Sequence, residues 1–310
     1  MIALTAGLSA AAQAQEVRLV VPFPPNGVTD LTARLVATHL SRAWKTTINV
    51  DNVPGEGATT GTLVVLRAPP DGSVMLMTAT GQVTQNPAID SRLAYRWDEP
   101  LHIARVTASP LVFVVRGDSS WADLKSVLAD IRREPRRYKY GTSGAGGAAI
   151  IVMARLLDAG GVKWSEVGRV SFLGGSGILA GLIEGKTDFA AQYLAEMKPL
   201  LASGQVKPLA VSTTARVAAL PNVTTGAESG FPTFNLVGWT GIAGPPGLPA
   251  AVVERWDAAI QGLSRDSEFR AALAALSAEP AYLGPAAFKA ALKTEYEEAL
   301  SAAGKLGLRK

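Results

Sequence analysis

The sequence predicts an α/β fold in two domains. Strand-like and helix-like runs alternate along most of the chain, which is typical of layered α/β folds. The length of 310 residues favours two domains over one. In addition, two turns rich in proline or glycine each follow a predicted strand and precede a predicted helix, one in each half of the chain.

The first of these turns follows a strand predicted over 17–21. Its sequence is Pro22-Phe23-Pro24-Pro25-Asn26-Gly27, in which three prolines stiffen the backbone and remove three N–H donors. The N–H groups from Gly27 to Asp30 then lie in the first turn of a helix, where they have no intrahelical partner and favour an anion. This indicates a main-chain pocket for a small carboxylate, although an ordinary β–α turn explains the motif equally well on its own.

The second turn covers residues 140–147. It follows a strand predicted over 138–142 and precedes an apolar helix predicted over 148–157. Two anion-presenting turns in separate halves of one chain suggest a ligand held between two domains, where α/β folds commonly bind ligands.

The remaining elements follow from periodicity, caps and turn signals. Further strands are expected at 48–53, 74–78, 103–107, 112–115, 167–173, 188–191, 207–212 and 236–241. Further helices are expected around 31–40 and at 61–67, 122–133, 177–184 with Ser176 as N-cap, 196–202, 249–263, 267–276 and 285–302. Residues 111–115 and 236–242 are the best candidates for strands that cross between domains. We therefore expect domain one at 16–113 plus 240–310 and domain two at 114–239.

Composition excludes several classes of protein. The chain is 48% hydrophobic with a net charge of +4, so it can bury cores and lacks the strongly basic character of many nucleic-acid-binding domains. The densest basic cluster, within 132–137, ends a charged helix, where cations suit the helix dipole, and no nucleic-acid partner is expected. There are no cysteines, which excludes disulfides and thiolate catalysis.

The first 15 residues resemble an export signal. They are small and apolar and end near Ala12-Gln13-Ala14, which is similar to a signal-peptidase site. A basic start is missing, so the signal is expected to be truncated; an N-terminal helix of the fold is the alternative. No later run is long enough to span a membrane, and we expect an exported, soluble, periplasmic protein.

The sequence does not contain a complete set of catalytic residues in any motif that we recognise. The stretch 144–149 matches the permissive dinucleotide fingerprint, but the next strand ends without the acid that would bind a ribose. Gly141-x-Ser143 lacks the last glycine of a nucleophile elbow, and His39 and His102 both lie upstream of it. Asp30 suits the start of a helix and is interpreted first as structural. We expect no enzyme, no cofactor and no metal; an α/β enzyme acting on a small acid or nucleotide is the alternative.

Several segments in order resemble one family over nearly the whole chain. They are residues 20–30, Asp51-Asn52-Val53-Pro54-Gly55-Glu56-Gly57, Ala68-Pro69-Pro70-Asp71-Gly72, 141–147, 209–221, and Gly238-Trp239-Thr240-Gly241 with Gly244-Pro245-Pro246-Gly247. Each segment is weak alone, but the ordered set resembles the Bug receptors, the substrate-binding proteins of tripartite tricarboxylate transporters.

The resemblance implies a type II-like periplasmic binding protein with its ligand cleft between two domains. Such a receptor closes on a small organic carboxylate and delivers it to membrane permease subunits, and we expect a monomer. A sensor that presents ligand to a signalling receptor would use the same fold. The ligand contacts that the resemblance implies are Phe23, Pro24, Asn26, Gly27, Asp30, Thr78, Ala79, Thr80, Thr142, Ser143, Ala145, Gly146, Gly147 and Gln192.

Departures from the family pattern bear on the ligand. The family commonly has glycine at Asn26, lysine at Leu173, histidine near Ile150 and an acid near Gln192. Fewer charges would then surround the pocket, which favours a ligand with one carboxylate and a less polar remainder, such as an aromatic or short monocarboxylic acid. A charge supplied from another position would alter this expectation.

Overall fold

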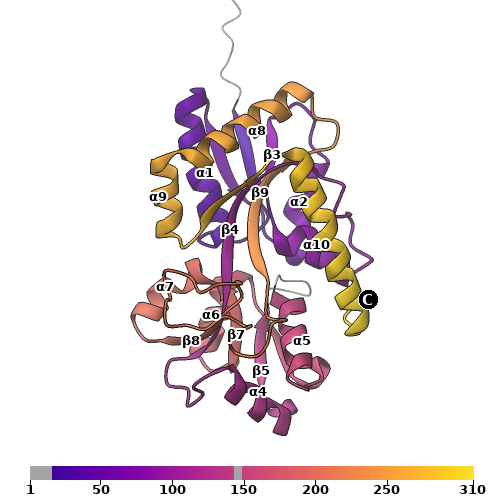
Figure 1. The fold of residues 1–310 in the computed structure, drawn as a ribbon. Helices are drawn as coiled ribbons and strands as arrows, with labels where there is room; N and C mark the ends of the chain where they lie inside the picture. The colour runs from indigo at the N-terminus through magenta and orange to yellow at the C-terminus, as the bar shows by residue number, and fades with distance from the viewer. Residues whose placement is uncertain (1–15, 143–148) are drawn as a thin grey trace, which may run out of the picture.

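The computed structural model describes residues 16–142 and 149–310, which form two lobes (Figure 1). In this part of the chain a ten-stranded sheet passes through both lobes in the order β2-β1-β3-β9-β4-β7-β5-β6, with β8 and β10 also paired to β4. The strands are β1 Val17–Val21, β2 Ile48–Asn52, β3 Val74–Ala79, β4 Leu101–Arg116, β5 Lys139–Thr142, β6 Gly168–Ser171, β7 Phe189–Tyr193, β8 Val206–Val211, β9 Val237–Gly244 and β10 Glu279–Leu283.

Helices cover the sheet in both lobes. They are α1 Val28–Trp44, α2 Thr59–Leu66, α3 Asn86–Ile89, α4 Leu124–Arg133, α5 Ala149–Ala159, α6 Gly174–Ile183, α7 Leu194–Ala202, α8 Ala250–Arg265, α9 Ser267–Ala275 and α10 Pro285–Lys305. The five residues Gly81–Gln85 form a π-helix between β3 and α3.

The first lobe contains parallel strands β1, β2 and β3 next to antiparallel β9. Helices α1, α8 and α9 pack on this part of the sheet in one apolar core, where Leu19, Met75 and Trp256 are buried. The second lobe packs α4 and α5 against β5 and β7 in one core, and α6 and α7 against β4 and β8 in another. Burial of these separate apolar cores accounts for two compact lobes.

Strand β4 is the continuous connection between the lobes. Its first part pairs with β9 and β10, and residues from Leu111 onward pair with β7 and β8. The expected strands 103–107 and 112–115 are therefore one strand of 16 residues. The expectation that residues 111–115 and 236–242 cross between domains stays a prediction. The domain boundaries proposed near residues 113 and 239 stay a prediction.

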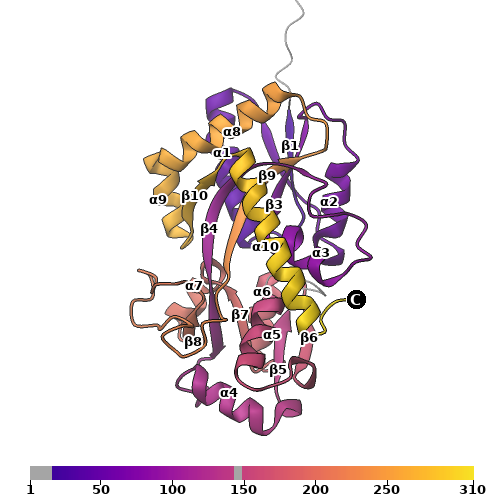
Figure 2. The ribbon, with the colours of Figure 1, turned by 45° about the vertical axis from the view of Figure 1, so that its right-hand side comes forward.

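Helix α10 links the lobes a second time (Figure 2). Ala299 and Ala303 on α10 belong to the same buried apolar cluster as Ile150 and Ala154 on α5. The Trp164 Nε1–H donates to the Leu306 carbonyl at 2.5 Å. The C-terminal helix of the first lobe is thus anchored on the second.

One feature in each lobe differs from the prediction. Helix α6 begins at Gly174 with Leu173 as N-cap, so the assignment of Ser176 as N-cap is wrong. Gly174 has a φ of +74°, which glycine adopts without strain, and this lets the helix start directly after β6. Strand β10 was not predicted, because its five residues include Pro280; it forms on the antiparallel edge that β4 offers.

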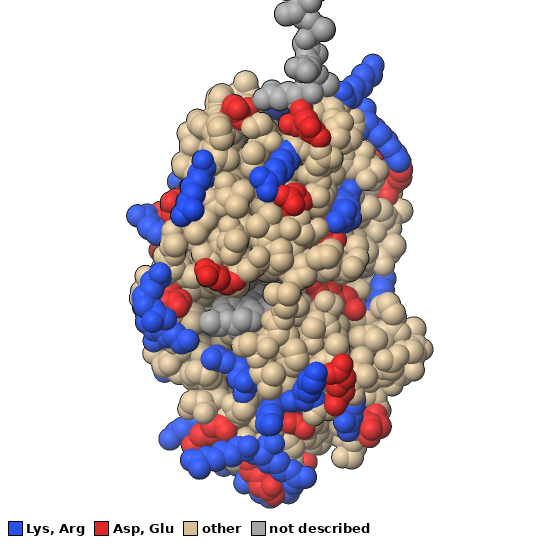
Figure 3. All heavy atoms as spheres, turned by 180° about the vertical axis from the view of Figure 1, so that it is seen from behind, with Lys and Arg blue, Asp and Glu red and all other residues tan. Residues whose placement is uncertain are grey.

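Surface charges are mixed in sign. Figure 3 shows Lys and Arg side chains interspersed with Asp and Glu. In the basic cluster, Arg133 pairs with Asp130 and Arg137 pairs with Glu134, which matches the predicted solvated helix end. Across residues 16–142 and 149–310, no helix is both long and apolar enough to cross a bilayer.

Candidate functional site

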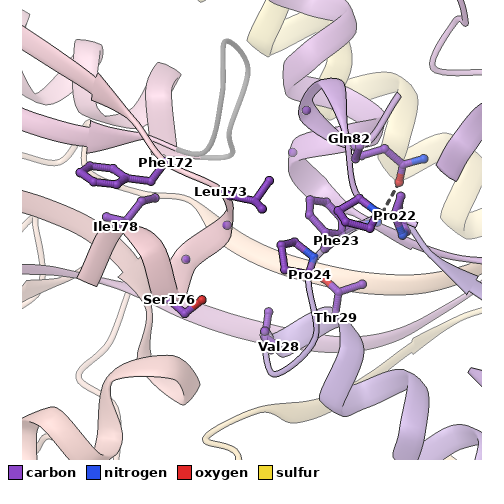
Figure 4. A pocket seen from close by; sticks show the side chains of 18 of the residues that line it. Pro22, Phe23, Pro24, Val28, Thr29, Gln82, Phe172, Leu173, Ser176 and Ile178 are labelled. Atoms are coloured by element: carbon purple, nitrogen blue, oxygen red, sulfur yellow. Dashed lines mark hydrogen bonds between the residues drawn. The ribbon is translucent and has the colours of Figure 1, made fainter. Parts of the chain in front are cut away.

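A cavity of about 300 Å³ lies between the lobes. Its first wall comes from the β1–α1 loop, residues 54–58 and the π-helix, and its second wall from the β6–α6 junction and the β7–α7 junction. Figure 4 shows Phe23, Pro24 and Val28 on one side and Phe172, Leu173 and Ser176 on the other. Leu173 is 68% exposed yet lines this cavity, so much of its apolar surface is available to an occupant.

The β1–α1 loop is held in place by Asp30. Its buried carboxylate accepts hydrogen bonds from the Asn26 main-chain N–H at 2.9 Å, from Asn52 at 3.0 Å and from Arg34 at 3.0 Å. Burial acts to raise the pKa of Asp30, but the bonds from Arg34, Asn26 and Asn52 outweigh it and hold that pKa below its ordinary value. Asp30 therefore stabilises the loop as an ionised group, which supports its structural interpretation.

Helix α1 begins at Val28, and its N-cap Gly27 offers no side-chain cap. Glu196, from α7 of the other lobe, fills this position: its Oε1 accepts the Val28 N–H at 3.1 Å. The start of α1 thus binds a carboxylate through its main chain, as expected of an uncapped helix start, and this carboxylate belongs to the chain itself.

Glu196 is the principal residue that sequence reasoning missed. Its Oε2 atom is buried and has no hydrogen-bond partner among residues 16–142 and 149–310. Burial raises the pKa of Glu196 to about 7, against the opposing effect of the Val28 N–H bond. The available signal was an acid four residues after Gln192, at the point where β7 gives way to α7. The expectation of fewer charges around the pocket did not anticipate this group.

The end of β3 supports the first wall. The Thr78 hydroxyl donates to Gln82 Oε1 at 2.9 Å, and Gln82 Nε2 donates to the Thr62 hydroxyl at 2.7 Å. Thr80 accepts the Trp239 N–H at 2.8 Å. These bonds fix the π-helix, whose Gly81 and Gln82 line the cavity.

The residues predicted from the resemblance fall into three groups. Six line the cavity: Phe23, Pro24, Gly27, Ala79, Thr142 and Gln192. Four support the walls and are not among the lining residues: Asn26, Asp30, Thr78 and Thr80. Ser143, Ala145, Gly146 and Gly147 lie outside the described residues.

Cationic side chains are missing from the described lining. It contains the acids Glu56 and Glu196 but no Lys, Arg or His. His39 Nδ1 lies 2.9 Å from the Leu35 carbonyl and His102 Nε2 lies 2.8 Å from the Trp97 carbonyl, so both histidines are engaged elsewhere. Within the described ranges no group of three or more His, Cys, Asp or Glu residues is placed to hold a metal ion.

Comparisons with known proteins identify the family. Residues 32–293 match the model described as tripartite tricarboxylate transporter family receptor. The UPF0065 protein in the tcbD-tcbE intergenic region of Pseudomonas sp. (strain P51) is 31% identical over 243 residues, which cover 78% of this chain and 71% of that protein.

Solved structures agree. The periplasmic binding protein BugD is 27% identical with a TM-score of 0.87, covering 95% of this chain and 98% of that one. MatC from Rhodopseudomonas palustris, with bound malate, is 26% identical with a TM-score of 0.86, covering 93% and 98%. These matches confirm the predicted periplasmic binding protein fold and the resemblance to Bug receptors. The chain belongs to the tripartite tricarboxylate transporter family of receptors, which are solute-binding proteins and not enzymes.

Proposed function

We propose that this receptor captures a small organic carboxylate in the cavity between its lobes and releases it to membrane permease subunits. The observation that carries the proposal is the cavity itself, lined by both lobes and bordered by helix starts. A related receptor, MatC, holds malate, which supports a small carboxylate as the class of ligand. Hinge motion about β4 and β9 would exclude water and strengthen the bonds to the anion.

The ligand's carboxylate is assigned to the second glycine-rich turn. Glu196 already occupies the first helix start, and a second carboxylate there would be repelled. Thr142 and Ala149, at the two ends of the second turn, both line the cavity. We propose that main-chain N–H groups between them bind the ligand, in line with the contacts expected at Ser143, Ala145, Gly146 and Gly147.

One carboxylate suits the cavity better than two or three. The described lining holds no cation to neutralise further negative charge, and much of it is apolar, including Phe23, Phe172, Leu173 and Ile178. A ligand with one charged end and a less polar remainder would match both properties. We further propose that the protein is exported to the periplasm, acts there as a monomer and docks to a permease.

Isothermal titration with short and aromatic monocarboxylates, dicarboxylates and citrate tests the proposal. Monocarboxylates are expected to bind most tightly and to raise the melting temperature without being converted. Gly146→Val should weaken binding at least tenfold in a protein that still folds, whereas Gly262→Val should not, since a Cβ at Gly262 meets nothing within 4 Å. A wide preference for citrate, or conversion of a ligand into a product, would contradict the proposal.

A further inference from the structure

Glu196 presents an acceptor that the described chain does not satisfy. An ionised carboxylate has about four positions at which it can accept a hydrogen bond. Oε1 accepts the Val28 N–H, while Oε2 is buried and finds no partner among the residues that the structure describes. Because an unpaired buried charge is costly, a donor supplied by an occupant of the cavity would be strongly favoured.

A donor lies directly beside this acceptor. Gln192 Oε1 accepts the Tyr193 N–H at 3.0 Å, which fixes the orientation of the amide and leaves Nε2 as its other end. A Cβ built on Gly175 would lie 1.7 Å from Glu196 Oε2 and 2.4 Å from Gln192 Nε2. Both polar atoms therefore pack against the same glycine, and both residues line the cavity.

Few groups complement an acceptor and a donor placed side by side. A primary amide does, since its N–H can donate to a carboxylate while its carbonyl accepts from an amide N–H. A second ligand carboxylate does not, because it would place like charges together where no Lys, Arg or His lines the described wall. A methyl ketone satisfies Gln192 alone.

We propose that Glu196, with Gln192, is a specificity determinant that selects monocarboxylates carrying a primary amide at the end remote from the carboxylate. Glu196 accepts the amide N–H, and Gln192 donates to the amide carbonyl. Gly175 is required for this arrangement, because any side chain there would displace both polar atoms. The inference rests on the proposed binding of a small carboxylate in this cavity.

Sets of isosteric ligands isolate the contribution of the amide group to binding. Succinamate, 4-oxopentanoate and succinate differ only in the NH₂, CH₃ or O⁻ on one carbonyl carbon, and 3-carbamoylbenzoate, 3-acetylbenzoate and isophthalate repeat the set at a longer spacing. In isothermal titrations at pH 8, the amide of at least one set is expected to bind about tenfold more tightly than its ketone, as for a hydrogen bond to a charged group. The dicarboxylate is expected to bind more weakly still.

Two variants test whether Glu196 causes the preference for the amide over the ketone. Glu196→Gln keeps an oxygen for the Val28 N–H but replaces the free acceptor by a donor, so the preference for the amide over the ketone should fall below threefold. Glu254→Gln removes the same charge from an exposed position on α8 that does not line the cavity, and should keep the tenfold preference. Melting curves verify that both variants fold.

Two results would overturn the inference in distinguishable ways. Equal binding of amide and ketone by the wild-type protein, or an unchanged preference in Glu196→Gln, would reject the amide site and leave carboxylate capture intact. No binding of any carboxylate, in a protein that melts cooperatively, would reject both.

Discussion

The two walls of the cavity are built differently. The β1–α1 wall is held by bonds within its own lobe, chiefly those that the buried Asp30 carboxylate receives from Asn26, Arg34 and Asn52. The second wall also makes contacts across the gap. A Cβ on Gly174 would lie 3.2 Å from Pro24, and Glu196 reaches across to Val28.

This difference suggests a division of roles. We expect the Asp30 network to hold the first wall in the same position with and without an occupant, and the second wall to adjust its position to the occupant. Closure of the second wall on the first would then respond to the occupant.

Removing Asp30 should have the largest effect, because it breaks the network of the first wall. Asp30→Ala leaves Arg34, Asn52 and the Asn26 N–H without their common acceptor, and we expect a loss of about 3 kcal/mol in the free energy of unfolding. Asp71→Ala, which removes an exposed carboxylate bonded to Ser73, should cost less than about 1 kcal/mol. Urea denaturation measures both; equal losses would remove the distinction between the walls.

The pH dependence of the free energy of unfolding should reveal the cost of burying the ionised Glu196 carboxylate. Its folded-state pKa of about 7 lies above its ordinary value of 4.5, so the folded state binds more protons between those values. Protonated Glu196 therefore makes its full contribution to the free energy of unfolding below about pH 4.5. This contribution, up to about 3 kcal/mol, is lost as pH rises through about 7.

Glu196→Gln should remove this loss, which shows as a difference from the wild-type protein that grows from pH 5 to pH 8. Subtracting the two denaturation curves isolates Glu196 from other titrating groups, including Asp30, whose depressed pKa acts at lower pH. A difference that stays constant with pH would mean that Glu196 is not desolvated in the folded protein.

A cation added to the second wall should change ligand preference by a smaller factor. Leu173→Lys places a cation at an exposed position of the cavity, and should improve dicarboxylate binding about fivefold relative to monocarboxylates. Val237→Lys changes another exposed large apolar side chain, which is not among the lining residues, and should leave the ratio unchanged. Titration calorimetry decides; equal shifts in both variants would indicate a general effect of net charge.

The smallest effect is expected at Ser176. Since Leu173 is the N-cap of α6, Ser176→Ala should change stability by less than about 0.5 kcal/mol. Asp266→Ala removes a side chain that caps α9 by accepting the Phe269 N–H, and should cost about 1 kcal/mol. A loss at Ser176 as large as that at Asp266 would restore the capping role predicted from the sequence.

Local signals accounted for most of the fold and for one loop that lines the cavity. The prolines and Gly27 mark the β1–α1 loop, and the structure places Phe23, Pro24 and Gly27 on the cavity. Glu196 was missed because its role depends on a contact 168 residues away in sequence, which no local pattern encodes. The single long β4 was predicted as two strands for a related reason: Ala108, Ser109 and Pro110 are poor strand formers, and pairing with β9 keeps them extended.

A crystal structure with the tightest-binding carboxylate would locate the ligand site. We expect the ligand in the cavity between the lobes, enclosed by Phe23 and Phe172, with its carboxylate next to the turn that joins Thr142 to Ala149. A ligand bound outside this cavity, or one whose carboxylate displaces Glu196 from the Val28 N–H, would exclude the proposed mode of binding.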